Sequence, residues 1–251
     1  MPKLGLIGLP LSHSHSPGLF ARIFHTEGLS GWDYRLFPLE NINQLHNLIE
    51  QEPELIGLNV TIPHKLNVIP LLNWISDEAK KIGAVNTIRI ERGKTLKFFG
   101  YNTDIFGFEA LLMQAIGKKT LPEGVLILGS GGAAKAVQYV LHKLNIPYLI
   151  VSRNKKENCI SYSEITKETI NKYKFIVNTT PVGMHPEIDK TPLLPLEYIG
   201  SEHTLIDLIY NPEETLLMKE CKKRGAGTFN GKTMLIQQAE KAWEIFNSHT
   251  K

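Results

Sequence analysis

A glycine-rich turn in the middle of the chain has the residue types and spacing that most directly indicate a ligand. Residues 129–134 read G-S-G-G-A-A; they follow the apolar run 125–128 and open a helix-forming stretch. Gly129 would allow a tight turn, Gly131 would let the backbone approach a pyrophosphate, and Ala134 would let the helix pack closely on a sheet. The pattern predicts dinucleotide binding; the alternative is a glycine-rich turn that binds nothing.

A basic segment after the next apolar run indicates which dinucleotide binds. Sites for NAD carry an acidic residue about 20 residues past the first glycine. The matching place here lies 152 − 129 = 23 residues on, and residues 152–156 read S-R-N-K-K. A carboxylate would repel a 2′-phosphate, whereas the Arg153 guanidinium can bind it through two hydrogen bonds. We therefore predict NADP, with Arg153 as the main contact; the alternative is a solvated basic loop.

The first hundred or so residues carry a second group of reactive and polar side chains, clustered where short apolar runs end. The four segments are residues 12–17 (S-H-S-H-S-P), 59–65 (N-V-T-I-P-H-K), 83–87 (G-A-V-N-T) and 102–104 (N-T-D). Each has an ordinary structural explanation when taken alone. Ser16 would cap a helix, Thr61 would reflect strand propensity, and Asn86 would make structural amide bonds.

Taken together, these motifs resemble the shikimate dehydrogenase family, which shows S-x-S-P, N-V-T-x-P-x-K, G-A-V-N-T and N-T-D in this order and at this spacing. The glycine turn and the S-R-N segment also match, as do residues 178–184 (N-T-T-P-V-G-M), 207–212 (D-L-I-Y-N-P) and 231–239 (G-K-T-M-L-I-Q-Q-A). The resemblance covers essentially the whole chain. Departures at Ser130, Ser152 and Asn154, where the family often has Ala, Asn and Thr, leave the strength of the NADP preference open.

The resemblance implies an oxidoreductase that interconverts 3-dehydroshikimate and shikimate with NADP. The hydroxyls of Ser14 and Ser16 are implied to bind the substrate carboxylate. The other implied substrate contacts are Thr61, Asn86, Asp104, Tyr210 and Gln238. The implied cofactor contacts are Asp77, Gly129, Ser130, Gly131, Gly132, Ala133, Ser152, Arg153, Asn154, Leu208 and Gly231. An acidic residue at a helix N-terminus explains Asp77 equally well.

Lys65 and Asp104 are the pair to which the resemblance assigns the chemistry. Reducing a ketone with hydride builds negative charge on the oxygen, so a positioned proton donor is needed. A lysine ammonium supplies both the proton and positive charge, and in the reverse direction a neutral amine accepts the proton of the alcohol. No metal is required. The alternative for this pair is a surface ion pair that links two loops.

The order of apolar and amphipathic stretches predicts the elements that must position these residues. Strands are expected at 4–9, 34–39, 55–62, 85–90, 95–99, 125–128, 148–151, 175–178 and 205–208, with a hairpin turn at Arg92-Gly93. Helices are expected from Ser16-Pro17 to about 28, at 42–49, at 76–82 with Ser76 as N-cap, from about 103, at 133–144, at 212–223, and near the end, where Leu235, Ala239, Ala242, Trp243 and Phe246 form one apolar stripe. Strands separated by helices predict parallel sheets.

We predict an α/β protein of two lobes. A substrate-binding domain is expected over 1–101 together with about 232–251, and a Rossmann-type dinucleotide-binding domain over 102–231. The resemblance implies that the last helix packs back on the first lobe. It also implies that the substrate binds in a cleft between the lobes, facing the nicotinamide.

Composition excludes several classes of function. The 251 residues are 42% hydrophobic and 21% charged, as in ordinary globular proteins, and the net charge of +3 is too small to predict a nucleic-acid or membrane partner. Cys159 and Cys221 form no C-x-x-C pair. Without a signal peptide or a run of about 18 apolar residues, a cytoplasmic location is expected.

Three rival interpretations stay open. One is a quinate/shikimate dehydrogenase of broader specificity, against which the S-x-S serines and the lack of an acid near Ser152 argue. The second is a non-catalytic NADP-binding sensor, which need not retain Lys65 and Asp104 together. The third, a metal site at His13 and His15 beside His64, rests on an H-x-H pattern that is weakly specific. The sequence does not determine the oligomeric state, and a homodimer stays open.

Overall fold

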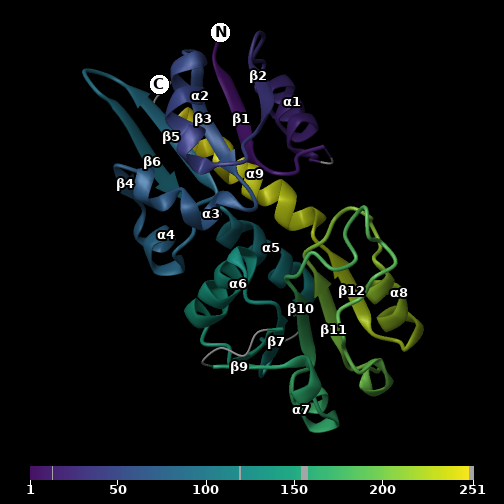
Figure 1. Ribbon diagram of the computed structural model, residues 1–251. Coiled ribbons are helices and arrows are strands. Elements are labelled where there is room, and N and C mark those ends of the chain that lie inside the picture. The colour runs from purple at the N-terminus through teal and green to yellow at the C-terminus, as the bar shows by residue number, and fades with distance from the viewer. Residues whose placement is uncertain (13, 119, 154–157, 249–251) are drawn as a thin grey trace. The chain divides into compact units, whose positions relative to one another are not determined.

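The computed structural model describes every residue except 13, 119, 154–157 and 249–251, and it divides into two compact units (Figure 1). Unit 1 comprises Met1–Asp104 and Ile236–Lys251, and unit 2 comprises Ile105–Leu235. Each unit is built on one six-stranded sheet. The predicted α/β class with two lobes is confirmed.

The sheet of unit 1 is mixed, not parallel throughout. Its strands, in spatial order, are β2 (Asp33–Pro38), β1 (Lys3–Gly8), β3 (Leu55–Val60), β5 (Thr87–Arg92), β6 (Leu96–Tyr101) and β4 (Trp74–Ile75). β1 runs parallel to β2 and β3, whereas β5 runs antiparallel to both β3 and β6. The expectation of parallel sheets therefore fails here, because the predicted tight turn at Arg92-Gly93 can join only antiparallel strands.

The helices of unit 1 follow local signals. They are α1 (Ser16–Thr26), α2 (Leu45–Gln51) after the 3₁₀ turn η1 (Ile42–Gln44), α3 (His64–Asn67) before the 3₁₀ turn η2 (Ile69–Leu71), α4 (Asp77–Ile82) and most of α9 (Lys232–Asn247). The predicted N-cap is confirmed, since Ser76 Oγ accepts a hydrogen bond of 3.2 Å from the Ala79 amide. Gly83 ends α4 with φ = 65°, a conformation that favours glycine.

The predicted return of the last helix to the first lobe is confirmed by aromatic packing inside unit 1, where Figure 1 shows α9 in yellow beside β1 and β3. The Trp243 ring meets the edge of Trp32 at 5.1 Å between centroids. Phe246 lies so close to the sheet that a Cβ atom on Gly57 would be 2.3 Å from its ring. The other face of the sheet is covered by a core that includes Leu45 and Ile88.

Unit 2 contains a fully parallel sheet. Its strands, in spatial order, are β12 (Gly227–Asn230), β11 (Thr204–Asp207), β10 (Phe175–Asn178), β7 (Val125–Leu128), β8 (Tyr148–Val151) and β9 (Cys159–Ile160). Numbered within the unit and read from the β9 edge, this is the strand order 3-2-1-4-5-6 of a dinucleotide-binding sheet. The direction in which successive strands are added to the sheet changes between β7 and β10. Ligands of such sheets bind beyond the carboxyl ends of the strands at that point. The Rossmann-type prediction is therefore confirmed.

The helices of unit 2 agree with the expected pattern except that the helix at Lys167–Lys172 was not predicted and one predicted helix starts later than expected. They are α5 (Asp104–Ile116, whose first residue belongs to unit 1), α6 (Gly132–Lys143), α7 (Lys167–Lys172) and α8 (Leu216–Lys223), with 3₁₀ turns η3 (Tyr162–Glu164) and η4 (Leu196–Tyr198). The expected helix from residue 212 begins only at Leu216, because Thr215 caps it through a 3.2 Å bond from the Met218 amide. Across the described parts of the chain, no helix has both the length and the apolar character to span a membrane.

We predict that Gly57→Ala lowers the free energy of unfolding by about 1–3 kcal/mol, because the added methyl group must displace the buried Phe246 ring. Gly18→Ala is the matched control. Gly18 lies in α1 and, apart from its chain neighbours and its own helix backbone, none of the described residues comes within 4 Å of its Cβ position, so the same change should stabilise by up to about 1 kcal/mol. Urea denaturation measures both; equal effects at the two glycines would contradict the packing described.

Candidate active site

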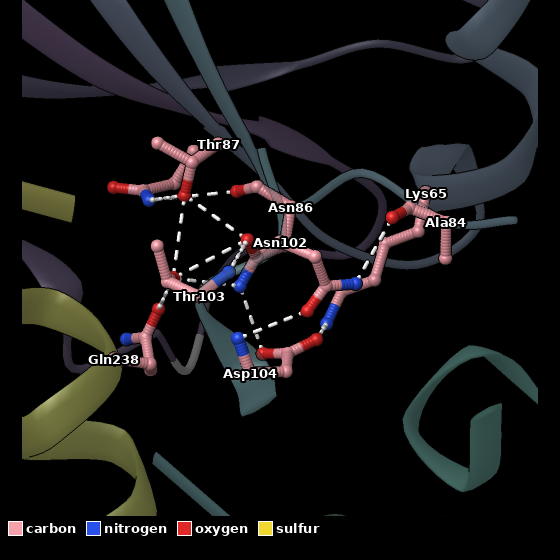
Figure 2. Close-up of polar contacts among 9 residues, drawn as sticks. Lys65, Ala84, Asn86, Thr87, Asn102, Thr103, Asp104 and Gln238 are labelled. Carbon is pink, nitrogen blue, oxygen red and sulfur yellow. Dashed lines mark hydrogen bonds and ion pairs between the residues drawn. The ribbon is translucent and has the colours of Figure 1, made fainter. Parts of the chain in front are cut away.

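The side chains of Lys65 and Asp104 form a close ion pair inside unit 1 (Figure 2). Lys65 lies on α3, Asp104 is the first residue of α5, and Lys65 Nζ lies 2.6 Å from Asp104 Oδ2. The side chains are only 18% and 8% exposed. Charges withdrawn from water to this degree need further hydrogen bonds to offset the cost of desolvation. The pair is therefore not a solvated bridge between surface loops.

Asn86 donates such a hydrogen bond to the Asp104 carboxylate, and Asn102 accepts one from the Asp104 backbone amide. Asn86 Nδ2 donates to Asp104 Oδ1 at 2.8 Å, so each carboxylate oxygen has its own donor. The Asp104 amide donates to Asn102 Oδ1 at 3.1 Å, and Asn102 in turn donates to the Ala84 carbonyl at 3.0 Å. The carboxylate is thus held in one orientation by groups from two neighbouring loops.

The network continues from Asn86 to α9. Asn86 Oδ1 accepts from the Thr103 amide at 2.7 Å and from Thr87 Oγ1 at 3.0 Å. Thr103 Oγ1 lies 3.4 Å from Gln238 Oε1. Three residues predicted to contact the substrate, Asn86, Asp104 and Gln238, therefore come together in unit 1, as Figure 2 shows. Thr87, Asn102 and Thr103 were not predicted as site residues, although they stand inside the quoted motifs.

A buried tyrosine joins this network to the serine-rich loop. Tyr34 Oη donates to Asn59 Oδ1 at 2.9 Å, and Asn59 Nδ2 donates to Thr87 Oγ1 at 3.3 Å. Burial raises the pKa of Tyr34 above its ordinary value, while a hydrogen bond with Ser16 acts in the opposite direction. Asn59 opens the N-V-T motif, which is a signal that could have singled it out; no sequence signal marks Tyr34.

The predicted carboxylate-binding hydroxyls lie at the start of α1. Ser14 Oγ accepts a hydrogen bond of 3.2 Å from the Ser16 amide. Ser16 is the first residue of the helix, so the alternative in which it caps that helix is wrong. Thr61 directly follows β3, and its amide donates to the Ile7 carbonyl at 2.9 Å. Ser14, Ser16 and Thr61 are all half-buried.

The glycine turn of unit 2 forms an open cradle at the N-terminus of α6. Gly129 has φ = 106°, which favours glycine. Gly131 occupies the N-cap position without a side-chain cap, and among the described residues no non-neighbouring atom lies within 4 Å of its Cβ position. Gly132 and Ala133 open the helix, so their amides are free of a side-chain acceptor at this end. The turn therefore fits a pyrophosphate, which such amides bind well.

The end of β8 lies beside this turn. Ser130 Oγ and Ser152 Oγ are 3.1 Å apart, which ties the glycine turn to the segment predicted to hold a second phosphate. Arg153 is exposed, and its charge opposes the rise in pKa that burial causes in Tyr162. Asn154, with the neighbouring Lys155 and Lys156, lies outside the described residues. The exposed guanidinium suits an extra phosphate charge.

The remaining predicted cofactor residues fall into two groups. Gly231 and Leu208 meet in unit 2, where a Cβ atom on Gly231 would lie 2.0 Å from the Leu208 carbonyl oxygen. Tyr210, a predicted substrate contact, follows on the same loop; it is half-buried, and burial raises its pKa. Asp77 belongs instead to unit 1, where its side chain is 86% exposed and pairs with Lys80 at 3.5 Å. Its place in the first turn of α4 already accounts for an acidic residue.

The histidines do not assemble a donor set in the part of the chain that the structure describes. No group of three or more His, Cys, Asp or Glu side chains there could hold a metal ion. His64 is buried, and its Nε2 lies 2.7 Å from the Leu39 carbonyl. His13 lies outside the described residues.

Comparison with known proteins gives consistent similarities. The family model described as the shikimate dehydrogenase substrate binding domain matches residues 6–88. A shikimate dehydrogenase (NADP⁺) of Clostridium beijerinckii is 44% identical over 257 residues, covering 98% of this chain and 92% of that protein. One of Methanococcus maripaludis is 39% identical over 259 residues, covering 97% and 90%. The crystal structure of shikimate 5-dehydrogenase from Thermus thermophilus with NADP(H) and shikimate superposes with a TM-score of 0.86 at 29% identity, covering 99% and 94%.

We predict that Asn86→Ala lowers the free energy of unfolding by about 1–3 kcal/mol, because it leaves the Thr103 amide and one oxygen of Asp104 buried without a partner. Asn43→Ala, which truncates an exposed amide, should change stability by less than about 0.5 kcal/mol. Urea denaturation of both variants provides the comparison. An Asn86→Ala protein as stable as the wild type would show that the network does not offset the buried charges.

Proposed function

The chain belongs to the shikimate dehydrogenase family, and from this premise we propose that Lys65 and Asp104 perform the proton transfer of its reaction. The chain is an NADP-dependent oxidoreductase that interconverts 3-dehydroshikimate and shikimate. The observation that carries the proposal is the 2.6 Å contact between Lys65 Nζ and Asp104 Oδ2, with Asn86 bound to the other carboxylate oxygen.

Lys65 is the proton donor in the direction of reduction. NADPH, when bound, supplies the hydride that forms the new C–H bond at the carbonyl carbon. As negative charge grows on the carbonyl oxygen, the Lys65 ammonium gives that oxygen a proton, and the amine later recovers a proton from solvent. In the direction of oxidation the neutral amine removes the hydroxyl proton. A single nitrogen thus serves both directions.

Asp104 keeps that nitrogen in place and binds the substrate. Because Asn86 and Asn102 hold the carboxylate and its main chain, the position of Oδ2 is set before any substrate arrives. A preset partner lowers the entropy cost of bringing the proton donor to the reacting oxygen. Lone pairs on the same carboxylate can accept a hydrogen bond from a ring hydroxyl of shikimate.

Neutral groups bind the rest of the substrate. The hydroxyls of Ser14 and Ser16 hold its carboxylate, which they can do without forming a salt bridge. Thr61, Asn86, Tyr210 and Gln238 contact the ring hydroxyls and the carboxylate. Support comes from the hydrogen-bonded connection that runs from Ser16 through Tyr34 and Asn59 to Asn86 and Asp104.

Unit 1 is the substrate-binding domain and unit 2 the dinucleotide-binding domain of this proposal. The amides at the glycine turn bind the pyrophosphate, and Ser152, Arg153 and Asn154 bind the 2′-phosphate. Leu208 and Gly231 line the nicotinamide end, and Asp77 is a further cofactor contact in unit 1. The support is the open cradle at Gly131 and the exposed Arg153 beside Ser152.

The partner of the reaction is a small molecule. A homodimer and a cytoplasmic location stay predictions, and size-exclusion chromatography with light scattering tests the first of them.

We predict that Lys65→Ala lowers kcat for shikimate oxidation by about 10²–10⁴-fold, because the reaction loses its proton-transfer group. The measurement follows NADPH formation at saturating shikimate and NADP. Lys94→Ala, which removes an exposed lysine of the hairpin, should leave kcat unchanged. Full activity of the Lys65→Ala protein would move the proton donor elsewhere or favour the non-catalytic sensor.

We predict that Arg153→Ala raises KM for NADP by about 10–100-fold, the usual worth of charge-assisted hydrogen bonds to a phosphate, with little change in KM for NAD. Lys167→Ala, an exposed lysine at the start of α7, is the control. Running the wild type on quinate and shikimate with both cofactors decides the rival. A larger kcat/KM for quinate with NAD would favour the enzyme of broader specificity.

A further inference from the structure

Unit 2 contains a fully buried carboxylate that the reaction described above does not use. Asp207 ends β11, and Asn178 ends the neighbouring strand β10 in register with it. Neither residue is exposed, and Asn178 Nδ2 donates to Asp207 Oδ1 at 3.0 Å. A buried carboxylate is costly unless its oxygens find donors, so the residues around this pair must be arranged to provide them.

The donors to Asp207 are neutral groups near the carboxyl ends of β10 and β11. Oδ1 also accepts from the Ile209 amide at 3.1 Å, and Oδ2 accepts from Thr215 Oγ1 at 2.7 Å. No ion pair to Asp207 occurs among the described residues. Burial raises the pKa of Asp207 to about 6, while the bonds from Thr215, Ile209 and Asn178 act in the opposite direction. Hydrogen bonds therefore replace a counter-charge here.

Asn178 carries the connection towards the glycine turn. Its Oδ1 accepts from the Thr180 amide at 3.0 Å and from Thr180 Oγ1 at 2.7 Å. The side chains of Thr179 and Thr180 lie against Gly129, where a Cβ atom would be 2.7 Å from Thr179 Oγ1 and 3.0 Å from Thr180 Cγ2. The position of this pair of threonines thus limits where the backbone of the glycine turn can lie.

On its other side, the Asp207–Asn178 pair is connected to Leu208 and Gly231, the residues proposed to line the nicotinamide. The Leu208 amide donates to the Asn178 carbonyl at 3.0 Å, and the Ile209 carbonyl accepts from the Gly231 amide at 3.0 Å. Leu208 and Gly231 touch closely enough to exclude a Cβ atom between them. Asp207 and Asn178 therefore stand between the glycine turn at Gly129 and the contact of Leu208 with Gly231, two segments that are distant in the sequence.

We propose that Asp207, acting through Asn178, is the positioning group that sets the glycine turn relative to the Leu208–Gly231 contact, so that both ends of one NADP molecule fit unit 2 together. This inference rests on the proposed function. Asp207 touches no part of the cofactor in this arrangement. Its effect is to fix the spacing of the groups that do.

The carboxylate is suited to this task because both of its oxygens are acceptors. Asn178 and Ile209 need an acceptor at Oδ1, and Thr215 needs one at Oδ2. The isosteric amide of Asp207→Asn offers an acceptor on only one side, so one set of donors is left facing an NH₂ group. The shape of the core stays the same, while the alignment of the strand ends is lost.

Calorimetric titration with NADP and with adenosine 2′,5′-bisphosphate, a fragment that lacks the nicotinamide end, tests this proposal. For Asp207→Asn we expect Kd for NADP to rise about tenfold or more, because the two binding segments are no longer preorganised for one ligand, while Kd for the fragment stays within about twofold. His203→Gln is the matched control. His203 is buried just before the opposite end of β11, where its ring meets Gly200 and the Ile170 carbonyl, and its variant should lose stability without changing either Kd.

Thr215→Val removes the donor to Oδ2 and should show the same pattern more weakly, which keeps the test decisive if Asp207→Asn does not fold. Equal loss of affinity for NADP and the fragment, or no loss for either, would overturn the proposal. The wild type is assayed for NADPH formation from shikimate in parallel. Binding of NADP without that turnover would refute the proposed function and leave the positioning result standing.

Discussion

The structure of unit 1 depends on keeping one ion pair largely out of water. Lys65 and Asp104 are mostly buried, and their attraction alone does not offset the lost hydration. Asn86 donates to the Asp104 carboxylate and accepts from the Thr103 amide, while Asn102 accepts from the Asp104 amide. These residues stand just before β5 or just after β6. The antiparallel hairpin that makes this sheet mixed is therefore also what brings them together. In the proposed reaction, an ammonium held this way needs little reorganisation when the substrate arrives.

Unit 2 also contains a buried carboxylate, that of Asp207. There the reversal of strand order between β7 and β10 opens a place for a dinucleotide, and the uncapped amides at Gly131 face it. Among the residues that the structure describes, Asp207 has no cationic partner, and it is held by neutral donors. In the proposed mechanism, unit 1 uses its buried carboxylate to hold the proton donor. In the proposal for unit 2, the buried carboxylate holds two backbone segments at the spacing that a long ligand needs.

Local signals made much of this predictable from sequence. The glycine turn between a buried strand and a helix, the cap at Ser76 and the turn at Arg92-Gly93 each depend on a few neighbouring residues. The contact of Tyr34 with Asn59 depends instead on both flanking strands pairing with β1, which no local pattern reveals. The two-residue strands β4 and β9 are too short to show periodicity. The helix start at Leu216 was missed because a cap, Thr215, outweighed the apparent continuity from Pro212.

The place of Lys65 at the reacting oxygen is tested most directly by a crystal structure with shikimate and NADP bound together. The account predicts that Nζ lies within about 2.6–3.2 Å of the oxygen of the hydroxyl group that becomes the carbonyl, or reaches it through one water, while Oδ2 of Asp104 still contacts the ammonium. An ammonium turned away from that hydroxyl, with no water between them, would contradict it.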